Sequence, residues 1–241
     1  MRALDPEVVD TVWAAVEAKI PPHPENYPLG CHRPRVRDRD CFEVKLVRLV
    51  TGCSWEDAER LCGKKVSDTT VRARRDEWIE AGIFTAIVEE AITAYDKIIG
   101  LDLSDVAVDG ANRNDSVLRA PTLDDVKANG LLGDIQTVWL DRGYDSTATR
   151  DRLEERGIHD AVIAKKRKRG DARGKQRQPM GLRWPVERTN SWLSNFGQLR
   201  RNTDRKTRHR LAQFALAVVF IITAKLIDWR NRWSPGCVPI R

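Results

Sequence analysis

Three short apolar runs alternate with helical segments after Gly100, and this alternation constrains the fold more than any other feature of the chain. The runs cover residues 106–108, 135–140 and 161–164. A helical pattern opened by Pro121 lies between the first two runs, and another from Ser146 to Arg156 ends at Gly157. Strands that alternate with helices favour a parallel sheet. We therefore predict an α/β fold with flanking helices for this part of the chain.

The first hundred residues have the pattern of helices separated by turns. Asp5 and Pro6 form a helix start, and a second helical pattern covers residues 38–50. Ser54 and Ser67 are placed to cap two further helices, joined by a short turn. Such a pair is either a helix-turn-helix or a plain helical hairpin, since caps do not distinguish them. We predict a helical region over residues 1–100 and a catalytic domain, including a C-terminal helix, over residues 101–241.

Positive charge is concentrated in one segment. Residues 165–210 contain sixteen Lys or Arg and three acidic residues, a balance of +13, although the whole chain is only +7. A solvated basic tail is the ordinary explanation of such a run. Trp184, Trp192, Phe196 and Leu199 interleave with the basic residues, however, and an unstructured tail would not carry them. The segment therefore favours contact with nucleic acid. In the helix-turn-helix interpretation, three further arginines would face phosphates: Arg72, Arg74 and Arg75.

Cysteine usage and hydropathy indicate an intracellular, cytoplasmic protein. The five cysteines are odd in number and lack CxxC pairing, which favours reduced thiols over a zinc site or a disulfide framework. The opening segment MRALDPEVVD has no apolar core of a signal peptide. Residues 211–227 form the membrane candidate, but they are short for a span and include Gln213 and Lys225. We expect a buried core helix there and no membrane association.

Three carboxylates stand where metal chemistry would need them. Asp109 and Asp141 each close an apolar run, and the 31 residues between them suffice for one crossover connection. The two strands would then be neighbours, with both aspartates at their carboxyl ends, where a divalent cation could be shared. Asp-Gly and Asp-Arg-Gly-Tyr are also ordinary turn sequences. Glu187 lies inside the basic segment, in what we expect to be the first turn of a helix opened by Trp184 and Pro185.

The segments LDRGYDS and RWPVERTNSWLSNFGQLRRN, with AKKRKRG between them, resemble bacterial insertion-sequence transposases of the family-five group. TGCSWEDAERLCGKKVSDTTVRARRDEWIEAGIF resembles that group's helical DNA-binding region, so the resemblance covers nearly the whole chain. It implies an RNase H-like DDE core with Asp109, Asp141 and Glu187 as catalytic acids and ligands of Mg²⁺ or Mn²⁺. The implied partner is double-stranded DNA, as terminal inverted repeats and target, bound by a homo-oligomer. The implied DNA contacts also include Lys165, Lys166, Arg167, Lys168, Arg183, Arg200 and Arg201.

The sequence departs from this family pattern in two places. Met180 and Ser194 occupy the positions of the tyrosine and lysine in the family's terminal signature, so Arg200 or Arg201 would have to supply the lysine's phosphate contact. VAVDGANRNDS has a single DG where the family has two, which implies loss of the intervening β-hairpin and a truncated sheet. We expect an impaired transposase. The alternatives are a non-catalytic DNA-binding protein that occupies element ends or inhibits the intact enzyme, and a nuclease that uses the same acids.

Overall fold

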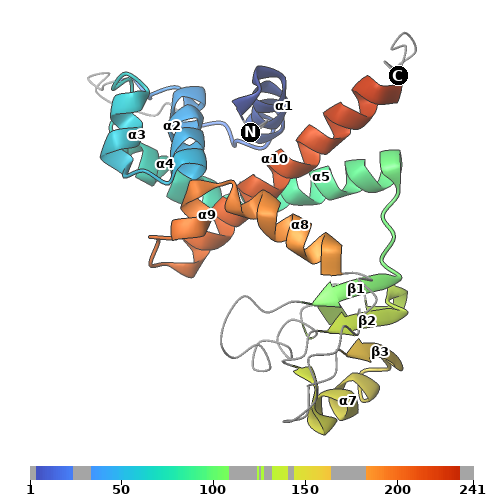
Figure 1. The fold of residues 1–241 in the computed structure, drawn as a ribbon. Coiled ribbons are helices and arrows are strands. Elements are labelled where there is room, and N and C mark those ends of the chain that lie inside the picture. The colour runs from blue at the N-terminus through green and yellow to red at the C-terminus, as the bar shows by residue number, and fades with distance from the viewer. Residues whose placement is uncertain are drawn as a thin grey trace, which may run out of the picture. The chain divides into compact units, whose positions relative to one another are not determined.

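The protein contains two compact units, seen in a computed structural model (Figure 1). The structure describes residues 4–23, 34–108, 132–140, 144–163 and 183–233, together with three residues between 124 and 127. Unit 1 combines residues 1–100 with residues 191–241, and unit 2 covers residues 101–190. The predicted order of a helical region followed by a parallel sheet with flanking helices is confirmed.

Capping side chains define the helices at the start of unit 1. Asp5 accepts a hydrogen bond from the Glu7 amide at the beginning of the first helix, and Ser54 and Ser67 cap the third and fourth helices as the sequence predicts. Gly52 ends the second helix in the left-handed conformation. The five helices are α1 (Pro6–Glu17), α2 (Asp38–Thr51), α3 (Trp55–Leu61), α4 (Asp68–Glu80) and α5 (Ile83–Ile99).

Two C-terminal helices, α9 (Gly197–Arg201) and α10 (Thr207–Trp233), contribute to the core of unit 1. The helix before them, α8 (Arg183–Ser194), begins in unit 2 and ends in unit 1. α10 packs on α1 and α5, and its Phe220 ring stacks on Phe42 of α2, with 6.3 Å between the ring centroids. The described residues from 191 onward share a core with the N-terminal helices, because the apolar faces of α1, α2 and α5 pack on α10. A catalytic domain over residues 101–241 stays a prediction.

α10 includes the segment that hydropathy marks as a membrane candidate. Within the described residues it is the one helix long and apolar enough to cross a bilayer. Leu216, Val219, Phe220 and Ile227 are buried in the unit 1 core, as expected for the central helix of a helical unit. Part of the apolar surface of α10 is therefore used in packing inside unit 1, while Leu211 and Phe214 are exposed.

Unit 2 contains a parallel three-stranded sheet in the order β1-β2-β3. Its strands are β1 (Asp105–Val108), β2 (Thr137–Leu140) and β3 (Asp160–Ile163), within the predicted runs or one residue before them. α7 (Thr147–Glu154), capped by Ser146, connects β2 to β3. Val138, Leu140, Tyr144, Leu153 and Ile158 form the small core of this unit. Among the described strands β1 pairs with β2 alone, so it is an edge of this sheet.

Candidate catalytic and DNA-binding sites

The pairing of β1 with β2 brings the carboxyl ends of the two strands next to each other. Val108 is the partner of Leu140, so the last residues of both strands stand side by side. Two side-chain hydrogen bonds connect the three strands nearer their amino ends. Trp139 Nε1 donates to Asp105 Oδ1 at 3.0 Å, and Thr137 Oγ1 donates to Asp160 Oδ2 at 3.0 Å. A slip by one residue would break both bonds and turn every side chain to the other face of the sheet.

Two of the three predicted catalytic acids follow these strands. Asp109 is the next residue after Val108 and Asp141 the next after Leu140, and both lie outside the described residues. Glu187 lies on α8 and its side chain is exposed. It is the fifth residue of that helix and not in the first turn as predicted, because the helix begins at Arg183. Among the described side chains, no group of three or more His, Cys, Asp or Glu could hold a metal ion.

α4 carries three arginines that the sequence analysis predicts to face phosphates, and the structure gives them different surroundings. Arg72 is exposed and forms an ion pair with Asp68 of the same helix. Arg75 is buried, donates to Asp76 at 2.9 Å, and lies over the Trp55 ring at 5.5 Å. Arg74 is also buried. In this conformation Arg72 is therefore the one member of the trio that a DNA phosphate can reach.

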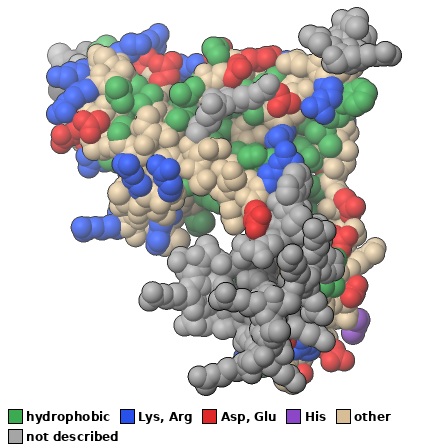
Figure 2. Space-filling view, viewed as in Figure 1, with side chains coloured by type: hydrophobic (Ala, Val, Ile, Leu, Met, Phe, Trp, Pro, Cys, Tyr) green, Lys and Arg blue, Asp and Glu red, His purple; other side chains and the backbone are tan. Residues whose placement is uncertain are grey.

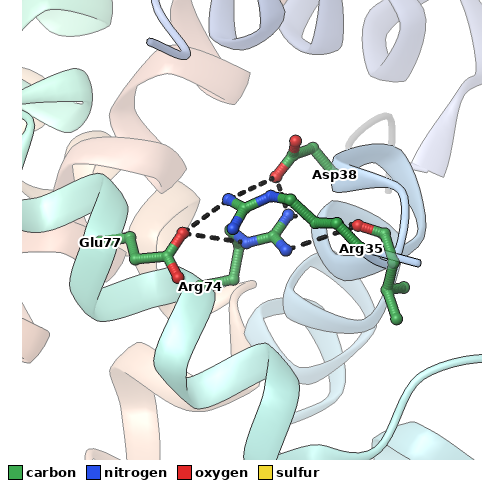
Figure 3. A network of polar contacts seen from close by, with 5 residues as sticks. Arg35, Asp38, Arg74 and Glu77 are labelled. Atoms are coloured by element: carbon green, nitrogen blue, oxygen red, sulfur yellow. Dashed lines mark hydrogen bonds and ion pairs between the residues drawn. The ribbon is translucent and has the colours of Figure 1, made fainter. Parts of the chain in front are cut away.

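Arg74 belongs to a polar network that joins α4 to the start of α2 (Figure 3). Its guanidinium pairs with Asp38, and its Nε lies 3.2 Å from Glu77 Oε2. Arg35 reaches the same Glu77 oxygen at 2.6 Å. The Arg74 side chain is only 4% exposed, so the partners compensate for the loss of water around its charge. Its role in the structure is to connect helices.

The remaining predicted DNA contacts lie in the basic segment. Arg200 and Arg201 end α9, and both are exposed. Arg183 is the first residue of α8, and nothing of its side chain is described. Four predicted contacts lie outside the described residues: Lys165, Lys166, Arg167 and Lys168.

A further group of basic side chains lies buried in unit 1 and was not singled out from the sequence. The Lys45 ammonium lies 4.2 Å from the centre of the Trp78 ring and 4.3 Å from that of Phe84. Arg48 lies over Trp55 at 4.2 Å. Burial lowers the pKa of Lys45 well below its usual range, and the charge of Arg75 lowers it further. The helical spacing could have indicated this burial, since Lys45 and Arg48 lie next to the apolar residues Val44, Leu46 and Leu49 on the buried part of α2.

Comparison with known proteins assigns both parts of the chain. Residues 91–223 match the family described as transposase DDE domain, and residues 8–88 match a family described as putative transposase of the IS4/5 family. The putative transposase of insertion sequence element IS402 from Burkholderia cepacia is 36% identical over 102 residues. The match covers 40% of this chain and 46% of that relative, so it spans about half the relative's length. No solved structure matches the chain. Because the DDE domain match alone takes in more than half of the residues, this chain belongs to the transposase DDE domain family.

Proposed function

We propose that this protein is a cytoplasmic DNA transposase that binds the terminal inverted repeats of an insertion sequence and cleaves and joins DNA strands. The single observation that carries the catalytic part is the parallel pairing of Val108 with Leu140. Adjacent strands lie about 4.8 Å apart, and each predicted aspartate follows its strand by one peptide bond. The carboxyl ends of parallel strands form the edge at which such folds place chemistry. The paired strand ends therefore support the proposal that Asp109 and Asp141 share one site.

The donor set suits a hard divalent cation. Asp109, Asp141 and Glu187 offer carboxylate oxygens, which Mg²⁺ and Mn²⁺ prefer. Such a cation supplies charge stabilisation and an activated water for phosphodiester cleavage. In our proposal Asp109 and Asp141 hold it, and Glu187 joins them from α8. The basic side chains of residues 165–210 bind the DNA backbone. A homo-oligomer would bring two element ends together, since strand transfer acts on both.

We further propose that cleavage by this chain is weak. A catalytic carboxylate needs packed neighbours to hold its position within about 0.5 Å. β1 pairs on one side with β2 in the described sheet, and the sequence lacks the family's second DG segment, which would supply further strands. The strand that leads to Asp109 is therefore less supported than its counterpart in a full-length family member. The second candidate function, a DNA-binding protein without catalysis that inhibits an intact transposase, rests on this same observation.

The test compares the natural chain with one that carries a family-like hairpin between Gly110 and Ala111. Both are assayed for Mg²⁺-dependent cleavage and strand joining on DNA that carries the element's ends. We expect weak cleavage by the natural chain and a gain on insertion, lost again when Asp141→Asn is added. Efficient end-specific cleavage by the natural chain would refute the impairment. Binding of the ends with no cleavage by either chain would favour the inhibitor. Cleavage without strand joining would favour a nuclease.

A further inference from the structure

Five exposed basic residues lie at the end of α9, in the turn that follows it and in the first turn of α10. We call this group the basic corner, and its members are Arg200, Arg201, Arg205, Lys206 and Arg210. Among the described ion pairs none involves a member of the basic corner, whereas Arg72 on α4 is paired with Asp68. Figure 2 shows Lys and Arg side chains gathered over α9 and the turn to α10. Unit 1 thus carries here a group of exposed positive charges that no described ion pair neutralises.

Arg48 of α2 contacts the turn between α9 and α10 from the interior of unit 1. Arg48 Nη2 lies 3.2 Å from Thr203 Oγ1 and 3.6 Å from Asp204 Oδ1. Gln213 of α10 donates a hydrogen bond to the same aspartate. The side chains of Arg48 and Asp204 are 5% and 9% exposed, so this contact lies inside the protein. The Asp204 carboxylate therefore neutralises the charge of Arg48, and the positive charges at the surface of the turn have no described ion-pair partner.

Two further contacts hold the start of α9. The Gln198 side-chain amide is fully buried and lies 3.1 Å from Thr203 Oγ1, which ties α9 to the turn that follows it. Gly197 meets Gly52 backbone to backbone, so closely that a methyl group on Gly52 would lie 2.6 Å from the Gly197 carbonyl carbon. A surface that is ordered before binding loses less conformational freedom on binding. The basic corner is such a surface.

We propose that the basic corner is a preformed phosphate-binding surface that grips duplex DNA by its backbone, whatever the base sequence, with Thr203 and Asp204 as its positioning residues. The proposal rests on the proposed function and identifies the surface of unit 1 through which that function would contact DNA. Arginine and lysine contacts to phosphates fix a protein's position on the duplex and carry no sequence information themselves. Family membership favours DNA over an anionic membrane or RNA, which would offer similar charge.

The first test measures how affinity depends on salt. The full chain is titrated with two unrelated 20-base-pair duplexes between about 50 and 300 mM salt. Each neutralised phosphate contributes about 0.9 to the log-log slope. We expect Arg200→Gln with Arg201→Gln, and separately Arg205→Gln with Lys206→Gln, to lower the slope by about 2 and to weaken binding of both duplexes at least about 10-fold. The matched control, Lys19→Gln with Arg60→Gln, removes two basic residues that are already ion-paired.

Several outcomes would overturn the proposal. Equal slopes for the natural chain and both corner variants would do so while leaving the proposed transposase intact. A loss confined to Arg72→Gln would place the surface on α4. Preferential binding to an RNA hairpin or to vesicles with anionic lipid would replace DNA as the partner. If the natural chain bound no duplex at all, both this proposal and the proposed function would fail.

The second test separates positioning from charge. Asp204→Asn removes a negative charge close to the basic corner, so simple attraction predicts tighter DNA binding. A positioning role predicts weaker binding, about 10-fold by analogy with supporting residues around metal sites. Because this variant leaves Arg48 without its carboxylate, Thr203→Val is tested beside it, which removes a hydroxyl and no charge. Faster amide hydrogen exchange over residues 202–206 should accompany the loss. Tighter binding by Asp204→Asn together with unchanged binding by Thr203→Val would refute the positioning role.

Discussion

Val108 and Leu140 are direct partners in the parallel pairing of β1 with β2, so the two strands end at the same level, one residue before Asp109 and Asp141. The register itself is fixed farther down the strands, where the Trp139 indole donates to Asp105. A site that depends on this edge should therefore respond to changes at the two aspartates and remain insensitive to carboxylates elsewhere on the sheet.

We expect Asp141→Asn to weaken Mn²⁺ binding by the natural chain at least about 10-fold, because one of the charged oxygen ligands is lost. Titration calorimetry measures this without requiring any DNA cleavage. The control is Asp151→Asn, an exposed carboxylate in the middle of α7. Equal Mn²⁺ affinity in the natural chain and in Asp141→Asn would contradict a shared site at this edge.

Arg74 should matter for stability and not for DNA binding. Arg74→Met removes the buried guanidinium from the network and leaves Asp38 and Glu77 with Arg35 alone, and losing hydrogen bonds to charged groups costs about 1.5–3 kcal/mol. Arg72→Met breaks an exposed pair on the same helix and should cost less than about 0.5 kcal/mol. Urea unfolding compares the two variants. A drop in DNA affinity for folded Arg74→Met, with unchanged stability, would restore the original phosphate interpretation.

Local signals in the sequence predicted the elements well, and long-range packing was the part that they could not supply. Ser54, Ser67 and Ser146 cap the helices as expected, because a cap depends on three neighbouring residues. The association of α10 with α1 and α5 depends on contacts between residues more than a hundred positions apart. No local pattern in the sequence specifies that the apolar face of α10 packs on those of α1 and α5.

The burial of two α4 arginines could have been inferred from spacing. Val71, Arg74, Arg75 and Trp78 stand at positions i, i+3, i+4 and i+7, which is one face of a helix. With Val71 and Trp78 in the core, the arginines between them must also point inward. What spacing could not show is the compensating charge, since Asp38 lies 36 residues away from Arg74. The predicted catalytic aspartates remain predictions, because both lie outside the described residues.

Lys45 should make the stability of the protein depend on pH. Its Nζ has no hydrogen-bond partner among the described residues, and burial lowers its pKa well below the ordinary value. An unfolded chain keeps this proton up to about pH 10.4. The folded chain releases it at lower pH, so between the two pKa values the unfolded state binds more protons. The free energy of unfolding should therefore rise with pH in that window.

Lys45→Met tests this dependence. Removing the buried amine should raise the free energy of unfolding at pH 7 by on the order of 1 kcal/mol, although the contacts with Trp78 and Phe84 offset part of the gain. The rise in stability with pH below about pH 10.4 should flatten. Urea unfolding across this range gives both quantities, with Lys19→Met, a partly exposed lysine, as the control. The same pH slope in Lys45→Met would assign the effect to another group.

The close approach of Gly52 to Gly197 should be measurable separately from backbone strain. Gly52 and Gly82 have nearly equal φ angles, +71° and +70°, so alanine at either position meets the same left-handed penalty, about 1–2 kcal/mol. Nothing lies within 4 Å of a methyl group at Gly82, whereas at Gly52 it would meet the Gly197 backbone. Backbone cannot move aside as a flexible side chain can. Gly52→Ala should therefore cost about 2 kcal/mol more than Gly82→Ala in urea unfolding. It should also speed hydrogen exchange in α9, where Gly82→Ala should not. Equal costs for the two variants would show that α9 does not depend on this contact for its position.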